Sequence, residues 1–158
     1  MGHLMTWIIR GLILVICGIA LLMTAAESDS PVGKWKTFDD KTGRVKSIVQ
    51  IKEENGELTG KVLEVLESPA GPHPLCRPCE GERKDQPVEG MTILWGAKKN
   101  GASWEEGEIL DPENGKIYHV TLTLLDSGQK LEVHGYVGIS AIGRSQIWQR
   151  QEERSSNQ

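Results

Sequence analysis

Residues 117–137 read IYHVTLTLLDSGQKLEVHGYV, two segments of alternating apolar and polar residues joined by a short turn. Alternation with a period of two is typical of a β-strand that buries one face, so 117–125 and 130–137 are predicted to be strands. A turn centred on Ser127-Gly128 fixes their register. The apolar face then carries the pairs Leu124 with Leu131 and Leu122 with Val133, followed by Val137. The segment is therefore predicted to form an antiparallel hairpin with one buried face.

The same signals recur on both sides of this hairpin. Two more hairpins are predicted about Asn-Gly turns: 46–53 with 57–66 about Asn55-Gly56, and 91–98 with 103–110 about Asn100-Gly101. Asn-Gly suits a type I′ turn because both central residues need positive φ. The first turn sets Val49 against Val62 and Ile51 against Gly60. A turn at 111–115 and a last strand at 143–150 complete the pattern.

These elements define the fold class. No segment after residue 30 shows a sustained 3.6-residue apolar period, so no helix is predicted there. Eight or so short antiparallel strands point to an all-β fold, either a barrel or a sandwich. A closed barrel is favoured because closure leaves no unpaired strand edge. We therefore predict a single antiparallel β-barrel over 27–150, followed by a polar tail at 151–158.

The amino terminus has the form of an export signal. Arg10 is followed by an apolar run at 11–23 and then by Thr24-Ala25-Ala26, the order of a secretory signal peptide with a small-residue cleavage site. The apolar run is too short to cross a hydrocarbon core of about 30 Å. We expect a signal-peptide helix at 1–26 and a periplasmic or secreted protein. The alternative is an uncleaved anchor, which would be the chain's one contact with the membrane.

The charge balance excludes one class of partner. The chain has 22 acidic and 18 basic residues, a net charge of −4, and loss of Arg10 with the signal peptide makes this about −5. Such a surface repels nucleic-acid phosphates, and no Lys/Arg cluster offers a local exception. We expect no nucleic-acid partner, no cofactor, no resident metal and a monomeric protein.

One long segment interrupts the strand pattern. Residues 68–89 contain five prolines, the pair Cys76 and Cys79, and a charged run at 80–85. No strand is expected through that density of proline. The Cys-x-x-Cys pair could be redox-active, could bind metal with His73, or could form a structural disulfide. The disulfide is favoured because the flanks are loop and proline rather than a strand followed by a helix.

Several other residues are candidates for chemistry. His119, His134, Tyr136 and Trp95 could form a ligand-binding site if the polar strand face lined the barrel interior. A water-facing position is favoured because the apolar residues of the same strands need the core. Asp111 with the acidic cluster Glu105, Glu106 and Glu108 could suggest glycoside hydrolysis, but an Asp before Pro more often organises a turn. No catalytic residue is predicted, and the protein is expected not to be an enzyme.

Ordered motifs along the chain carry a resemblance to a known family. They are Ser30-Pro31-Val32-Gly33-Lys34-Trp35-Lys36-Thr37; Asn55-Gly56; Cys76-x-x-Cys79-x-Gly81-Glu82-Arg83-Lys84; Pro87-x-x-Gly90-Met91; Ile109-Leu110-Asp111-Pro112-x-x-Gly115-Lys116-x-Tyr118; and Gly135-Tyr136-x-Gly138-x-Ser140-x-x-Gly143-Arg144-x-Gln146-x-Trp148. Together they resemble the bacterial secreted family catalogued as domain of unknown function 2147. The resemblance covers nearly all of the chain after the signal peptide. It implies no established activity.

A second resemblance concerns architecture. Gly33-x-Trp35 at the first strand, with Arg144 or Arg150 on the last, resembles the calycin signature of lipocalins and fatty-acid-binding proteins. In that signature a tryptophan packs under an arginine at the closed end of the barrel, an interaction worth about 0.5–2 kcal/mol. Trp148 is expected to join Trp35 in packing this region. The resemblance implies a calycin-like or lipocalin-like barrel.

The function expected from this fold is binding. We expect a small apolar or amphipathic ligand, or an envelope component, to bind in the barrel cavity or at its mouth beside the cysteines. The alternative is a packed-core interaction module whose loops at 84–91 and 138–144 contact another envelope protein. A Cys-x-x-Cys redox protein or a hydrolytic enzyme is the third class. A cavity of about 300–1,000 Å³ would favour ligand binding and a filled core the interaction module.

Overall fold

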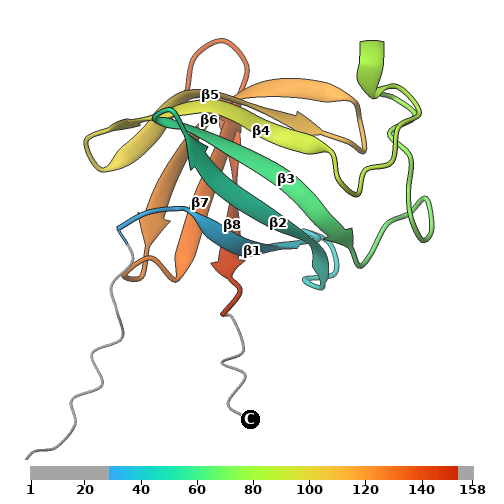
Figure 1. Ribbon diagram of the computed structural model, residues 1–158, viewed down its shortest axis with the longest axis horizontal. Helices are drawn as coiled ribbons and strands as arrows, with labels where there is room; N and C mark the ends of the chain where they lie inside the picture. Colours follow the sequence, from blue (N-terminus) through green and yellow to red (C-terminus); the bar gives the residue numbers. More distant parts are fainter. Residues whose placement is uncertain (1–28, 153–158) are drawn as a thin grey trace, which may run out of the picture.

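The chain forms a closed eight-stranded antiparallel barrel (Figure 1). The computed structural model describes residues 29–152, so the expected signal peptide at 1–26 and the tail beyond Glu152 lie outside the described residues. The strands are β1 (Gly33–Phe38), β2 (Val45–Glu54), β3 (Glu57–Val65), β4 (Thr92–Asn100), β5 (Ser103–Asp111), β6 (Lys116–Leu125), β7 (Lys130–Tyr136) and β8 (Gly143–Arg150). One 3-10 turn, η1 (Gly81–Arg83), lies between β3 and β4. The all-β barrel predicted from the sequence is confirmed.

The predicted register is confirmed in the two hairpins for which the sequence predicted residue pairs, β2–β3 and β6–β7. Val49 pairs with Val62 and Ile51 with Gly60, while Leu124 pairs with Leu131 and Leu122 with Val133. The prediction for Val137 is wrong: β7 ends at Tyr136, and Val137 begins a loop in which its side chain is 70% exposed. Tyr136 already pairs with Gly143, and Gly138 at φ +76° turns the chain away from the sheet.

Among residues 29–152 no helix is long and apolar enough to cross a membrane.

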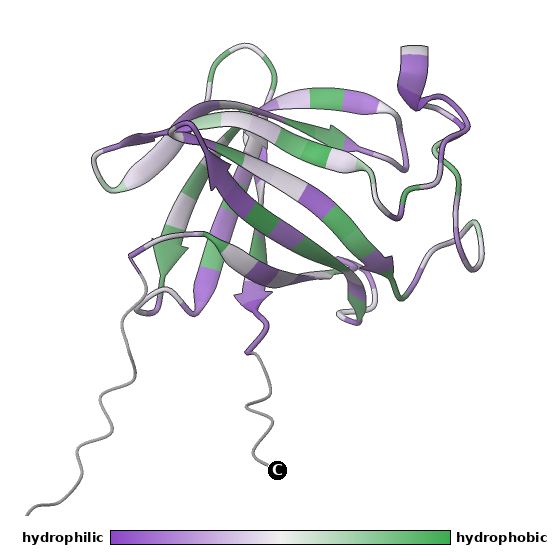
Figure 2. Ribbon diagram, in the orientation of Figure 1, coloured by the Kyte–Doolittle hydropathy of each residue, from purple (hydrophilic) through white to green (hydrophobic). Residues whose placement is uncertain are grey.

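Apolar side chains fill the barrel interior. Trp35, Val49, Ile51, Leu58, Leu94, Val120, Leu122 and Leu131 are fully buried, and Trp104 and Trp148 are nearly so. Figure 2 shows the alternation of hydrophobic and hydrophilic residues along the strands that produces this core. Strands also approach closely at two glycines: a Cβ at Gly60 would lie 2.9 Å from Cβ of Leu94, and one at Gly107 would lie 2.7 Å from Cβ of Ala97. The interior is therefore tightly packed at the level of these strands.

Arg150 closes the barrel at the end where the chain enters and leaves it. Its guanidinium carbon lies 4.3 Å from the centre of the Trp35 ring, and Arg150 and Trp35 are cross-strand partners between β8 and β1. Nε donates to the carbonyl of Gly128 at 2.6 Å, and the two Nη atoms donate to the carbonyls of Val32 and Ser30 at 2.8 Å each. Burial lowers the pKa of Arg150, yet a guanidinium remains charged at any ordinary pH. This one side chain ties β1, β8 and the β6–β7 turn together.

Arg144, the other arginine proposed for closure, lies elsewhere. It is at the start of β8 and forms an ion pair with Asp40 in the β1–β2 loop, at the opposite end of the barrel. Its side chain is largely exposed. The spacing along β8 explains the difference, because the six residue steps from one arginine to the other span about 20 Å of extended strand.

Arg150→Ala is expected to destabilise the barrel by about 2–4 kcal/mol, because it removes a cation–π contact and three hydrogen bonds from a charged donor. Arg144→Ala is the matched control and should cost less than about 1 kcal/mol, since its ion pair is exposed. Urea unfolding followed by tryptophan fluorescence measures both. Equal losses for the two variants would show that Arg150 does not have this closing role.

Candidate functional site

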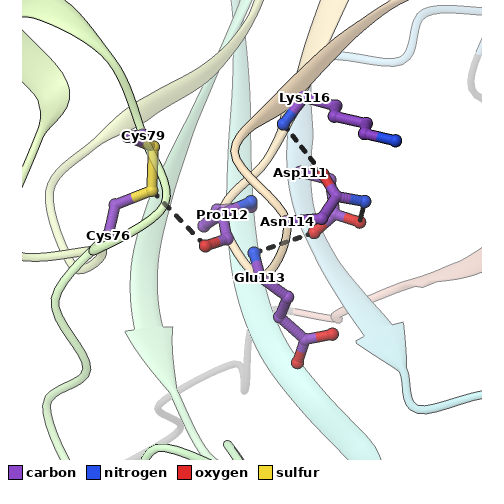
Figure 3. The surroundings of a disulfide bond; sticks show 7 residues. All are labelled: Cys76, Cys79, Asp111, Pro112, Glu113, Asn114 and Lys116. Atoms are coloured by element: carbon purple, nitrogen blue, oxygen red, sulfur yellow. Dashed lines mark hydrogen bonds between the residues drawn. A yellow bond between two sulfur atoms is a disulfide. The ribbon is translucent and has the colours of Figure 1, made fainter.

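The segment 66–91 between β3 and β4, here called the Cys loop, lies at the barrel end opposite Arg150. Cys76 and Cys79 are bonded as a disulfide within it, with Cα atoms 5.4 Å apart, and both residues are buried in the hydrophobic core (Figure 3). Backbone hydrogen bonds close the loop upon itself: Cys76 N–H donates to Gln86 O at 2.8 Å, and Val88 N–H donates to Pro74 O at 2.9 Å. Leu75 and Pro87 form an isolated bridge, so no strand runs through the prolines. The loop is a compact unit.

The β5–β6 turn packs directly against the Cys loop. Gly115 has φ +71°, and a Cβ at this position would collide with the carbonyl oxygen of Pro78. Sγ of Cys76 lies 3.4 Å from the carbonyl oxygen of Pro112 (Figure 3). Asp111 shapes the turn, because its carboxylate accepts from Glu113 N–H and from Asn114 Nδ2, both at 2.9 Å. Asp111 thus has the turn-forming contacts that the sequence favoured over catalysis.

His73, the third residue considered for a metal site, points to a different partner. Its Nδ1 lies 2.7 Å from Oε2 of Glu89, while Oε1 of Glu89 accepts from Val65 N–H at 3.0 Å. The backbone donor, and after it His73, lower the pKa of Glu89. These contacts tie the Cys loop to the end of β3. Within residues 29–152 no three His, Cys, Asp or Glu residues are grouped as a metal site.

A hollow of about 350 Å³ opens where the Cys loop meets the β5–β6 hairpin. Its walls come from Cys79, Glu80 and Arg83 of the Cys loop, Leu110, Gly115, Lys116, Ile117 and Tyr118 of the hairpin, and Val137 after β7. We call this site the rim hollow. Leu110 and Ile117 are cross-strand partners and supply an apolar wall. Arg83 and Lys116 add two cations, and Glu80 one carboxylate.

Arg83 is held in place by an aromatic ring. Its guanidinium carbon lies 4.6 Å from the centre of the Trp95 ring, and Trp95 Nε1 in turn donates to Oε2 of its cross-strand partner Glu108 at 2.8 Å. The 3-10 turn η1 ends at Arg83 and brings it to the hollow. Arg83 and Lys116 belong to the family motifs quoted above, but neither was predicted as a site residue. The charged run at 80–85 was the available signal, but nothing in the sequence showed that the loop folds back onto β5 and β6.

The four proposed ligand-binding residues lie together, but on the outer face of the barrel. Trp95 pairs with Glu108, Glu108 with His119, and His119 with Tyr136, which forms a row across β4 to β7. The Tyr136 ring centre lies 5.6 Å from that of His119 and 5.8 Å from that of His134. Their strand neighbours Val120 and Val133 occupy the core. None of the four lines the rim hollow, and together they do not form an interior site.

His134 organises the loop between β7 and β8. Its Nδ1 lies 2.9 Å from Ser145 Oγ, and its Nε2 lies 2.8 Å from the carbonyl oxygen of Ser140. Because a carbonyl oxygen only accepts, Nε2 carries the proton in this contact. The ring also packs against Gly143, where an added Cβ would lie 2.8 Å from it. His134 therefore has a structural task in holding this loop.

Residues 33–150, which include all eight strands, match the family described as "Uncharacterized protein conserved in bacteria (DUF2147)". The chain belongs to this family. The resemblance stated from the sequence motifs is thereby confirmed. The description of DUF2147 assigns no activity, so membership alone names no ligand.

A solved structure has the same architecture. It is described as protein HP1028 from the human pathogen Helicobacter pylori, belonging to the lipocalin family. The TM-score is 0.68 and the sequence identity 19%, with 78% of this DUF2147 chain and 84% of that chain covered. At this identity the likeness establishes the fold alone, and the lipocalin-like architecture expected from the sequence is confirmed. No curated protein matches the chain.

Gly115→Ala should separate the Cys loop from the β5–β6 turn. The added methyl group collides with Pro78 O, and the positive φ adds strain of about 1 kcal/mol. Gly101→Ala is the matched control, because Gly101 has φ +61° with no atom within 4 Å of the added Cβ. The free energy of unfolding should fall by clearly more for Gly115→Ala than for Gly101→Ala. Equal losses would mean that the loop does not pack on this turn.

The disulfide should resist reduction in the folded protein, because both cysteines are buried and a thiolate must reach a sulfur to attack it. Thiol titration after exposure to dithiothreitol should give reaction at least about 100-fold slower in native protein than in urea-unfolded protein. Rapid reduction of the native protein would instead support the redox alternative.

Proposed function

We propose that this protein is a non-enzymatic, exported binding protein whose ligand is a small amphipathic molecule with an anionic head, held in the rim hollow. The observation that carries the proposal is the combination of an apolar wall, Leu110 and Ile117, with two cations, Arg83 and Lys116, around one hollow of about 350 Å³. This volume lies at the lower end of the range for small-molecule sites, about 300–1,000 Å³. A single short acyl chain suits it better than a bulky lipid.

The two cations favour an anionic head group. Among residues 29–152 neither Arg83 nor Lys116 forms an ion pair with a carboxylate, so the charge of each is available to a ligand. Stacking on Trp95 leaves the guanidinium edge of Arg83 free to donate hydrogen bonds. Paired donors of this kind bind carboxylate and phosphate oxygens. Glu80 on the same wall would disfavour a dianion.

The barrel interior is a poorer candidate for the ligand. Lipocalin-like folds suit ligand binding inside the barrel, but here Trp35, Leu122 and Leu131 fill that space. A second hollow of about 310 Å³ lies at the closed end, between the β4–β5 and β6–β7 turns. Turn residues line it together with Asp29, Trp104, Leu124 and Lys99, and Lys99 is the one cation among these described residues. Lys99 already covers the Trp104 ring, at 5.4 Å from its centre. The rim hollow joins an apolar wall to two cations without carboxylate partners, so we assign the ligand there.

An interaction module is the second candidate function. The filled interior favours it, since a packed core leaves the surface as the place for recognition. The loop after β7 exposes three aliphatic side chains, Val137, Ile139 and Ile142. The proposal of export rests on the amino-terminal pattern at 1–26, and a disulfide persists in the oxidising compartments to which that pattern leads.

Decanoate and decyltrimethylammonium share a chain and differ in head charge, so they test the proposal. We expect isothermal titration to detect decanoate binding and little or no binding of the cationic analogue. Arg83→Gln and Lys116→Gln should each weaken decanoate binding about tenfold, the loss expected for one charge-assisted contact. Lys61→Gln, an exposed lysine on β3, is the control and should leave the affinity unchanged.

Two results would contradict the proposal. One is equal affinity for both amphiphiles, which would show that the cations do not select the head group. The other is decanoate binding that both hollow variants leave intact, which would place the ligand elsewhere in the protein.

A further inference from the structure

The loop between β7 and β8 presents the most exposed aliphatic side chains of the described chain. Val137, Ile139 and Ile142 are 70%, 64% and 70% exposed, more than any other large hydrophobic residue in 29–152. Figure 1 shows the loop as an arch that projects beyond the strands it joins. The segment 137–142 contains no charged residue. Exposed aliphatic residues on a projecting loop are a feature of interaction sites.

The loop holds these side chains outward in a defined conformation. His134 Nε2 donates to the carbonyl of Ser140 at 2.8 Å, and Ile142 N–H donates to the carbonyl of Ile139 at 3.1 Å. Gly138 has φ +76°, which turns the chain at the start of the arch. The loop is therefore already ordered before it binds a partner. Binding then costs less conformational entropy than it would for a flexible loop.

The shape and size of this patch fit a lipid surface better than a protein. Three aliphatic side chains can bury only a few hundred Å², well below the roughly 800 Å² that each partner contributes to a stable protein interface. A bilayer needs no matching surface, because a few apolar side chains on a projecting loop can enter the boundary between head groups and acyl chains. A convex loop is suited to such entry.

The charges around the loop indicate how it would bind. Arg144 is the first charged residue after the loop, and Asp40 neutralises it in an ion pair. The chain as a whole is acidic, with a net charge of −4. Attraction to anionic lipid therefore contributes little, and insertion of the aliphatic side chains has to supply the binding energy. Binding of this kind depends weakly on salt.

We propose that the β7–β8 loop inserts Val137, Ile139 and Ile142 into the surface of a lipid bilayer. Val137 also lines the rim hollow, so insertion would turn the hollow toward the membrane from which an amphiphile could enter it. This last step rests on the proposed function, whereas the contact with lipid does not.

The test is sedimentation of the protein, purified in the form that cells export, with vesicles of phosphatidylcholine or of phosphatidylcholine with phosphatidylglycerol. We expect binding to both vesicle types and little change between low and high salt. The double variant Ile139→Ser with Ile142→Ser should lose at least about tenfold in binding. The matched control is Leu125→Ser with Ile147→Ser, two exposed aliphatic residues away from the loop, and it should bind as the unaltered protein does.

Hydrogen exchange and decanoate titration complete the design. Vesicles should slow exchange at 137–142, a readout that separates the loop from any contribution of the amino-terminal segment. The loop variant should keep its decanoate affinity in the absence of vesicles. Vesicle binding with no decanoate binding would refute the proposed function and leave the lipid contact standing.

Three results would overturn the lipid proposal. The first is no sedimentation of the unaltered protein with vesicles, and the second is equal sedimentation of the loop variant. The third is that the unaltered protein forms a dimer, the loop variant does not, and neither protein binds vesicles. The last would assign the loop to contact with a second copy of the chain.

Discussion

The contact between Arg150 and Trp35 holds the first and last strands of the barrel together. A sheet of eight strands becomes a barrel only when its first and last strands meet, and β1 and β8 pair through just two residue pairs. Arg150 strengthens this short seam by stacking on the indole and by donating to three carbonyls, from Ser30, Val32 and Gly128. Closure gives every strand a neighbour on both sides, although β1 and β8 pair over only part of their lengths.

The two ends differ because the connections at them differ. Short hairpin turns such as Asn55-Gly56 and Asn100-Gly101 lie at the closed end with Arg150. Turns of this length provide few side chains that could form a binding site. The opposite end carries the Cys loop, the β5–β6 turn and the β7–β8 loop. Gly115 allows the first two to touch, and their junction with Val137 forms the rim hollow. The proposed site is thus formed by loops that the rigid barrel positions.

The fold was predictable from the sequence because its signals are local. Alternation along 117–125 and the turn at Ser127-Gly128 set a register that the structure confirms. The site was not predictable in the same way, since Arg83 reaches the hollow only when the Cys loop folds back onto β5 and β6. Val137 continues the apolar–polar alternation of β7 but lies outside the sheet. The alternation could not show this, because it does not indicate at which residue pairing with β8 begins. The sequence could not show whether Arg144 or Arg150 packs on Trp35, because that depends on how β8 pairs with β1.

In the proposed function the ligand binds at the rim hollow and not inside the barrel, because apolar side chains such as Leu122 and Leu131 fill the interior. A crystal structure with 10-bromodecanoate tests this proposal most directly, because anomalous scattering locates the bromine. We expect bromine beside Leu110 and Ile117, with the carboxylate at Arg83 and Lys116. Bromine within the barrel, next to Leu122 and Leu131, would contradict the proposal.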